Sequence, residues 1–323
     1  MTALVRDVRQ MLLQRAQQRG RPLLLAAKVP RNLEGCRVDG FDVQQWAREQ
    51  LVDLFTIGSR SADVDLAAFR EITAGHGIKL QPCFDDHHTT DGYRWPPSEV
   101  LRGVFGNWWQ QGADSVATFN WSNAPPDVCT RLGLPPGPLS HQRAYHEVGS
   151  AETLRWKDKT FFVERRGGYP WAEGFFNRND TAPLPVTLDG GAPTSLRMRV
   201  GDDLNGAGTQ LRTVLVRVIL FGAEDSVEID VRLNGHVLPL MLRDPRWKDP
   251  QIFSPRPQPA SGGSGLYQVN PQQRLLRLEF TVEPGQCRRG ENRLDIRLPA
   301  RPAGQPETKV VLEKLELQVG YAP

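Results

Sequence analysis

The spacing of apolar residues changes once along this chain, and that change restricts the fold more than any other feature of the sequence. Up to about residue 120, stretches with apolar residues at helical spacing alternate with short apolar runs of strand length. This alternation predicts four units of a helix followed by a strand, at 3–18 and 22–28, 42–50 and 53–57, 64–74 and 78–84, and 98–111 and 115–120. Because short apolar strands joined by helices pair in parallel, we predict a parallel sheet of the α/β class.

From about residue 184 the apolar residues alternate with polar ones, and Gly, Pro and Asn separate the segments. This alternation is typical of antiparallel strands that bury one face. Six such segments follow residue 184, and they predict an antiparallel β-sandwich or jelly roll. We therefore expect an α/β domain over residues 1–160, an interdomain segment over 161–183 and a β-sandwich domain over 184–323.

The charges and cysteines argue against several kinds of partner. The chain has 40 Lys and Arg residues against 37 Asp and Glu residues, and the basic residues are scattered, so we expect neither a nucleic-acid nor a membrane partner. The four cysteines lie far apart with no C-x-x-C pair, which argues against a zinc knuckle and a disulfide framework. Charged residues interrupt the first apolar stretch, so it does not resemble a signal peptide, and we expect a cytoplasmic protein. Separately, we expect no cofactor. A chain that begins inside a longer protein would look the same.

Polar residues follow each of the four predicted strands of the first half. The sequences are KVPR at 28–31, GSRS at 58–61, DDHH at 85–88 and NWSN at 120–123. A buried sheet has no packing reason to end four times in charged, amide or imidazole groups. Because functional groups collect at the carboxyl ends of parallel strands, we expect these residues to share a polar pocket.

The densest of these groups supplies our candidate catalytic residues: Asp85, Asp86, His87 and His88. Carboxylates beside imidazoles titrate on either side of neutrality, as general acid/base chemistry requires. An equally open alternative is that Asp85 caps the next segment and both histidines face solvent. Asp and His also bind zinc, manganese and iron, but adjacent residues cannot all point at one ion, so we expect no metal.

Cationic and aromatic residues near the same strand ends suggest how a ligand would be held. Fixed guanidinium and ammonium donors can clamp an acidic or multiply hydroxylated ligand. Flat aromatic rings beside amides and charges are typical of sugar-binding surfaces. For any one of these charges, a solvated loop residue is the more ordinary interpretation. The candidate substrate-binding residues are Lys28, Arg31, Arg60, Tyr93, Trp95, Asn120 and Trp121.

Three stretches of the first 160 residues resemble a known protein family. They read LLLAAKVPRNLEGCRVDGFDVQQWAREQLVDLFTIGS, KLQPCFDDHH and GNWWQQGADSVATFNW. They are similar to the C-terminal half of bacterial glycoside-hydrolase-like TIM-barrel proteins, often labelled family-10-like. The later phrases LNG and RRGENRLDIRL look like a galactose-binding-type jelly roll. By architecture, the family 156 sialidases are similar too. The resemblance implies a glycoside hydrolase acting at the carboxyl ends of the barrel strands, and it specifies no substrate.

The chain departs from that family in the number of strands. A complete barrel takes about 250 residues and eight strands, whereas four strands precede the β-domain here. We therefore predict a partial TIM-like (β/α) barrel: a half barrel with an apolar inner face and two unpaired edges. Because two-fold dimers are the commonest soluble assembly, we expect a homodimer in which two half barrels meet.

Two functions are consistent with these features of the sequence. The first is a glycoside-hydrolase-like enzyme that uses carboxylate acid/base chemistry through an oxocarbenium-like transition state. The second is a non-catalytic carbohydrate-binding or structural protein built on a truncated barrel. The polar strand ends favour the first, and the missing strands favour the second.

Overall fold

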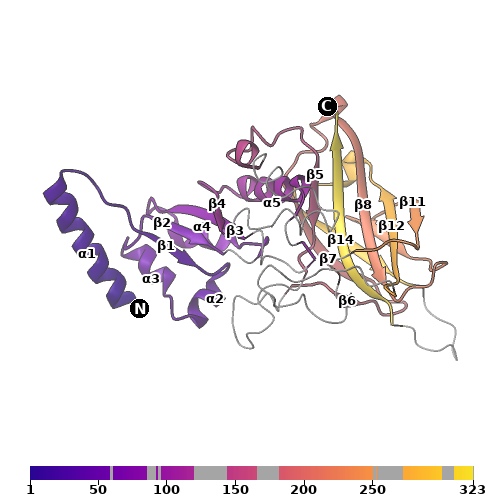
Figure 1. Ribbon diagram of the computed structural model, residues 1–323, viewed down its shortest axis with the longest axis horizontal. Coiled ribbons are helices and arrows are strands. Elements are labelled where there is room, and N and C mark those ends of the chain that lie inside the picture. The colour runs from indigo at the N-terminus through magenta and orange to yellow at the C-terminus, as the bar shows by residue number, and fades with distance from the viewer. Residues whose placement is uncertain are drawn as a thin grey trace.

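The computed structural model describes residues 1–58, 61–85, 92–93, 96–119, 144–165, 182–249, 252, 272–299 and 309–322. Helices and a small sheet occupy one end of the described chain, and long antiparallel strands occupy the other (Figure 1). The α-helices are α1 (Thr2–Arg19), α2 (Leu33–Val38), α3 (Val43–Arg48), α4 (Leu66–Thr73) and α5 (Ser98–Gln110). The strands are β1 (Ala26–Val29), β2 (Leu54–Ile57), β3 (Lys79–Asp85), β4 (Ala117–Phe119), β5 (Lys159–Phe162), β6 (Val186–Thr187), β7 (Thr194–Val200), β8 (Leu211–Phe221), β9 (Asp230–Leu233), β10 (His236–Val237), β11 (Leu240–Asp244), β12 (Leu275–Thr281), β13 (Gly290–Arg297) and β14 (Val311–Tyr321). Two 3₁₀ turns, Gly208–Gln210 and Pro284–Gln286, lie between the later strands.

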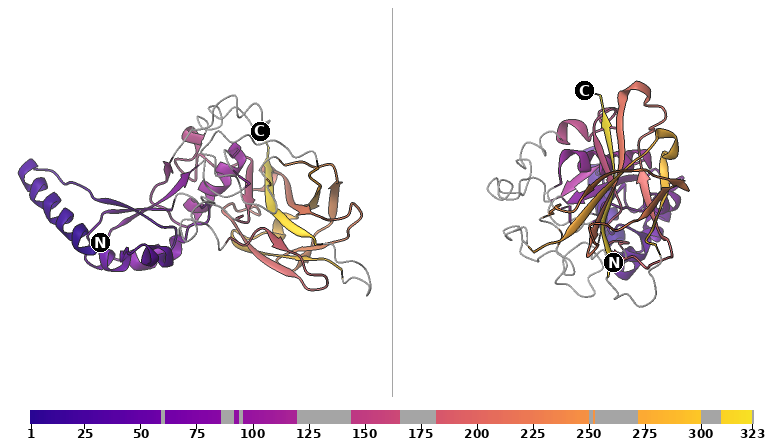
Figure 2. Two further views of the ribbon diagram at one scale, coloured as in Figure 1. Left: turned by 60° about the horizontal axis from the view of Figure 1, so that its bottom comes forward. Right: turned by 90° about the vertical axis from the view of Figure 1, so that its right-hand side faces the viewer.

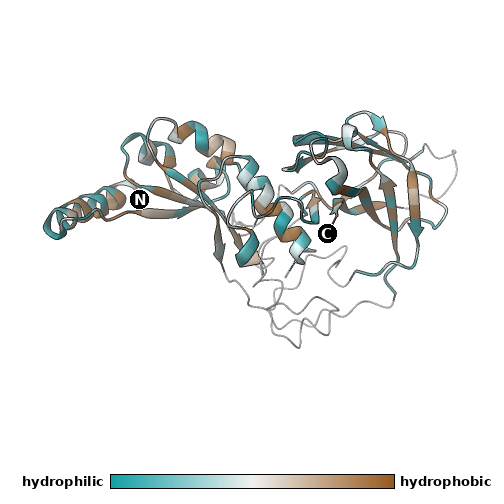
Figure 3. Ribbon diagram, turned by 90° about the horizontal axis from the view of Figure 1, so that it is seen from above, coloured by the Kyte–Doolittle hydropathy of each residue, from teal (hydrophilic) through white to brown (hydrophobic). Residues whose placement is uncertain are grey.

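Side-chain caps fix where three helices of the first part begin. Asn32, Asp42 and Asp65 each accept a hydrogen bond from the backbone N–H three residues later. Such caps satisfy donors that the first helical turn leaves without a partner. Polar and apolar residues both occur along these helices (Figure 3). In α3 the buried Trp46 and Ala47 lie three and four positions after the buried Val43, which is expected for a helix that buries one side.

The first part contains the parallel sheet that the sequence predicts. Strand β1 pairs with β2, β2 with β3 and β3 with β4, all in parallel, so this prediction is confirmed. One face packs against the helices in a common core, which includes Phe55, Ile57, Leu80, Phe84, Phe69, Phe105 and Trp108. The four strands lie in the order β1-β2-β3-β4, and no pairing among the described strands closes them. Their closure into half of a barrel stays a prediction.

The opposite face of this sheet differs from the expectation. We expected an apolar inner face, but the face carries Lys28, Thr56, Gln81 and Asp85, with Phe119 beside them. Lys28 and Phe119 are exposed, and Thr56 and Gln81 are partly exposed. The expectation was wrong because residues alternate between the two faces of a strand, and most of the large apolar side chains lie on the helix side.

The second part is built from two antiparallel sheets. One has the order β10-β9-β13-β7, and the other has the order β11-β12-β8-β14-β5, with β6 pairing to β14. Side chains from both sheets form one buried core, including Val216 of β8, Leu278 of β12, Leu294 of β13 and Leu317 of β14. The predicted antiparallel strands with one face in the core are therefore confirmed.

Strand β5 joins the two parts of the molecule. It follows the helix-rich part in the chain but pairs with β14, and the boundary predicted at residue 160 falls inside it. Phe161 lies in the core of the antiparallel sheets, and Phe162 packs against the core of the parallel sheet. Helix α5 lies so close to β5 that a Cβ atom on Gly103 would sit 2.2 Å from the main-chain oxygen of Thr160. The two parts share a tight seam.

The described helices are short or carry many charged residues. None of them, in the part of the chain that the structure describes, combines the length and the apolar character needed to cross a bilayer.

Candidate functional site

A polar surface covers the side of the parallel sheet that faces away from the helices. Strand register places Lys28 of β1 beside Thr56 of β2, and Thr56 beside Gln81 of β3. Asp85 points to the same side as Gln81, four residues earlier in β3, and lies in register with Phe119 of β4. We call these five residues the polar sheet face. Figure 2, in its left view, shows the helices along one side of these strands.

Hydrogen bonds order the centre of this face. The Thr56 hydroxyl donates to Oε1 of Gln81 over 3.0 Å, and Nε2 of Gln81 donates to the hydroxyl of Ser115 over 3.0 Å. Each side chain is therefore held in one orientation. A row of fixed donors and acceptors is the arrangement that recognises hydroxyl groups on a ligand.

An aromatic ring and a cation lie together at one side of the face. The ammonium nitrogen of Lys28 is 3.3 Å from the ring centroid of Phe119, a cation–π contact. Phe119 is 41% exposed as a residue, and the Lys28 ammonium covers one face of its ring. A ring surface beside directed polar groups is suited to the apolar C–H face of a sugar.

Asp85 is the innermost polar group of the face. It is the last residue of β3 and is fully buried. Asp85 also affects Cys83, two residues earlier in the strand. Burial raises the pKa of the Cys83 thiol to about 11, the positive charge of Lys28 opposes this rise, and the negative charge of Asp85 adds to it. The charges of Lys28 and Asp85 therefore both reach the Cys83 thiol. A carboxyl group enclosed at the carboxyl end of a parallel strand is a candidate for acid/base chemistry.

The loops after β1 and β2 are bound to each other at the neighbouring edge. Arg31 donates from Nη1 to the Ser61 hydroxyl and to the main-chain oxygen of Asp63, both over 3.4 Å. Gly58 makes the sharp turn after β2 with a φ of +72°, and a Cβ atom there would lie 3.5 Å from Cβ of Arg31. The guanidinium of Arg31 is thereby anchored beside the carboxyl ends of β1 and β2.

A buried carboxyl group that sequence patterns did not reveal holds this loop from the other side. Glu164 is 6% exposed, and its two oxygens lie within hydrogen-bond distance of the Ser61 hydroxyl and the N–H groups of Ala62 and Asp63. Burial, followed by the charge of Asp63, raises the pKa of Glu164 to about 7. No local pattern marks this residue, because its partners lie about a hundred residues earlier in the chain.

Tyr93, a candidate substrate-binding residue, lies buried at the seam between the two parts of the molecule. Its ring is buried and stacks on Phe162 with 4.1 Å between the centroids, while the ammonium of Lys314 lies 4.4 Å from the ring centroid. Its hydroxyl donates to Glu316 over 2.9 Å. Because its ring and hydroxyl are engaged at the seam with β14, Tyr93 does not belong to the sugar-binding set.

The structure thus brings Lys28 and Asp85 onto one face, places Arg31 on the adjoining loop and encloses Tyr93 at the seam. The remaining candidate residues lie outside the described residues; they are Arg60, Asp86, His87, His88, Trp95, Asn120 and Trp121.

Within the described ranges, no three His, Cys, Asp or Glu side chains gather in a way that could hold a metal ion.

Comparison with known proteins leaves the family of this chain open. No family model matches the sequence, and no curated protein matches it. Among solved structures, one similar chain is a family 86 glycoside hydrolase in complex with neoagarooctaose, with a TM-score of 0.28 and 6% identity over 51% of this chain and 19% of that chain. Another is a β-porphyranase of glycoside hydrolase family 86 from the human gut bacterium Bacteroides plebeius, with a TM-score of 0.25 and 10% identity over 99% of this chain and 73% of that chain. Similarity at this level supports no argument about fold or function.

Proposed function

We propose that this protein acts on or binds a glycan at the polar sheet face and at the adjoining carboxyl ends of the parallel strands. The observation that carries the proposal is the grouping of Asp85, Lys28 and the exposed residue Phe119 on one side of the sheet. A sugar ring needs an apolar platform and directed polar partners, and this face supplies both. Arg31, on the loop beside it, adds a fixed cationic donor.

In the enzymatic form of the proposal, the protein is glycoside-hydrolase-like and breaks an O-glycosyl bond. Asp85 or Asp86 is the candidate acid/base carboxylate, with His87 or His88 as its partner. Arg31, Arg60, Asn120 and Trp121 then hold the sugar, together with Lys28 and Trp95. Such a site stabilises an oxocarbenium-like transition state by giving a proton to the leaving oxygen. The burial of Asp85 is the structural feature that favours this role.

In the second form of the proposal, the same face binds a glycan without cleaving it. The described parallel sheet has four strands, whereas a complete barrel has eight and takes its catalytic residues from the ends of several of them. Binding without turnover would leave Phe119, Lys28 and Arg31 with the same contacts to the sugar.

A glycan-array screen and a chromogenic-glycoside screen of the purified protein separate the two forms. In the enzymatic form, Asp85→Asn lowers turnover at least about a hundredfold with the fold intact by circular dichroism, the scale of a lost general acid or base. Asp86→Asn is examined beside it, and Asp189→Asn, at an exposed position of the second part, is the matched control. Turnover that is unchanged in both test variants rules out the acid/base assignment. A parent protein that binds a glycan without turnover supports the binding form.

We further propose that two copies associate through the parallel sheet. Strand β1 is at the edge of the sheet, and among the described strands it pairs only with β2. Leu4, Met11 and Leu13 of α1 and the nearby Leu24 are exposed. An open strand edge beside exposed apolar side chains favours association. Light scattering at micromolar concentration should give the mass of a dimer, and a monomer with no concentration dependence contradicts this.

A further inference from the structure

The hydroxyl of Ser61 lies between two acceptors but has a single proton. It is 2.7 Å from Oε2 of Glu164 and 2.9 Å from the main-chain oxygen of Asp63. If Glu164 is ionised, only one of these two short contacts can be a hydrogen bond. If Glu164 carries a proton on Oε2, it donates to Ser61, and Ser61 donates onward to the oxygen of Asp63.

The remaining contacts of Glu164 are satisfied in the protonated arrangement as well. The N–H of Asp63 lies 2.8 Å from Oε2, which can accept it as a hydroxyl oxygen, and the N–H of Ala62 donates to Oε1 over 3.1 Å. Every polar atom in this cluster then has a partner. The geometry therefore matches the neutral acid of Glu164, which closes a continuous chain of hydrogen bonds.

Charged groups of both signs surround Glu164. A cavity of about 250 Å³ adjoins it between α5, β5 and β7, and the α5 residues at that cavity are uncharged. Burial raises the pKa of Glu164 most, the Asp63 carboxylate adds to the rise, and Ser61, Arg31 and the Asp63 N–H oppose it. The charged groups that face Glu164 are Asp63 and Arg31 on the loops and, across the cavity, Arg197, Arg199 and Glu291.

Arg31 is linked to this cluster through the same atoms. Its Nη1 donates to the Ser61 hydroxyl and to the Asp63 oxygen, which are the second and third members of the chain that begins at Glu164. When Glu164 loses its proton, the Ser61 hydroxyl turns to the carboxylate, and the Asp63 oxygen keeps only the donor from Arg31. The new negative charge also attracts the guanidinium.

We propose that Glu164 is a proton-sensitive positioning residue. As a neutral acid it holds residues 61–63 against the chain just after β5, in the form that leaves Arg31 at the edge of the sheet, and its ionisation draws the Arg31 guanidinium towards the Glu164 carboxylate. The effect on Arg31 requires no ligand. The consequence for ligand binding rests on the proposed function, in which Arg31 contacts the glycan.

Nuclear magnetic resonance of the full chain tests this without any ligand. With carbon-13 at the Glu carboxyl groups and nitrogen-15 in Arg, we expect the Glu164 carboxyl to titrate near pH 7. The Nε–H signal of Arg31 should move with the same midpoint. In Glu164→Gln the side chain cannot ionise, so the Arg31 signal should show no step near pH 7. The NH2 group of that side chain can donate to Ser61 but cannot accept from the N–H of Asp63, so the starting position of the Arg31 signal can differ from that of the parent.

Glu152→Gln is the matched control, because the Glu152 side chain is 84% exposed, and it should leave the Arg31 titration unchanged. The proposal is overturned if Glu164 titrates near pH 4.5, the ordinary range of a glutamate. It is equally overturned if the Arg31 signal moves as much in Glu164→Gln as in the parent. Failure of every glycan to bind would contradict the proposed function and leave this result standing.

Discussion

Two sheets of this protein carry polar side chains on the face turned away from their apolar core, and the two faces differ in how exposed those side chains are. On the six-stranded sheet, Arg217 lies 2.7 Å from Glu279 and 3.6 Å from Glu316, and all three are largely buried. Arg277 of the same face pairs with Asp244 over 3.2 Å. On the parallel sheet, the polar sheet face leaves Lys28 and the ring of Phe119 exposed.

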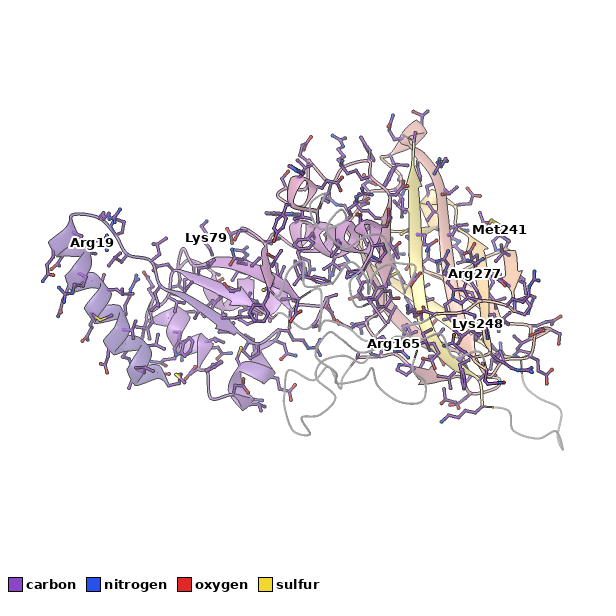
Figure 4. All side chains as sticks on the ribbon, viewed as in Figure 1. Arg19, Lys79, Arg165, Met241, Lys248 and Arg277 are labelled. Carbon is purple, nitrogen blue, oxygen red and sulfur yellow. The ribbon has the colours of Figure 1, made fainter. Side chains whose placement is uncertain are left out.

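The aromatic residues show the same contrast. Trp247 lies under the guanidinium groups of Arg277 and Arg217, 4.3 Å and 5.6 Å from its ring, whereas Phe119 has Lys28 over its ring and stays 41% exposed. Arg165 and Arg277, labelled in Figure 4, both lie at the strand-rich end of the molecule. Buried polar groups paired within the chain hold it together, whereas an exposed ammonium group and ring lie where a ligand can reach them. This is why we assign the glycan to the parallel sheet.

The largest effect expected from this contrast is on stability. Arg165→Met removes the guanidinium that lies 2.5 Å from Glu313 in a pair with no exposure on either side. The uncompensated buried carboxylate should cost about 3–5 kcal/mol of the free energy of unfolding, measured by urea denaturation. Lys28→Met, on the polar sheet face, is the comparison variant and should cost less than about 1 kcal/mol. Equal losses in the two variants would remove the distinction between the faces.

A smaller effect is expected at the seam between the two parts of the molecule, where α5 packs on β5. Gly103→Ala places a Cβ atom against the main-chain oxygen of Thr160, where neither backbone can move far. Overpacking of this kind should cost about 1–3 kcal/mol in the same denaturation experiment. Gly149→Ala is the control, since a Cβ atom there meets nothing within 4 Å. A stable Gly103→Ala variant would show that the two parts are not tightly packed on each other.

The sequence predicted the elements of this fold better than their surroundings. Helical spacing around Phe69 and Trp108, and alternation around Val216 and Leu278, placed the helices of the first part and the long strands of the second. Strands β6 and β10 have two residues each, too few for a period to show. Strand β5 owes its place to pairing with β14, about 155 residues away in the chain. Spacing within a segment cannot reveal such a partner.

The candidate site was predictable in the same limited way. Lys28, Arg31 and Asp85 follow from the rule that parallel strands carry function at their carboxyl ends. The position of Tyr93 did not follow, because its neighbours Phe162 and Glu316 come from distant strands. Lys28, Arg31 and Asp85 share a position at strand ends that the sequence marks, whereas the contacts of Tyr93 depend on strands that no local pattern relates to it.

The central claim is that the polar sheet face binds a saccharide, and the affinity of Phe119→Ala tests it most directly. The saccharide with the strongest signal on a glycan array is titrated into the parent protein and into Phe119→Ala by calorimetry. Tyr145→Ala, which removes another exposed ring outside the sheet, is the matched control. Loss of the stacking platform should weaken binding about fivefold to tenfold in Phe119→Ala. The control should bind as the parent does. Equal affinity of the parent and Phe119→Ala for that saccharide would contradict the account.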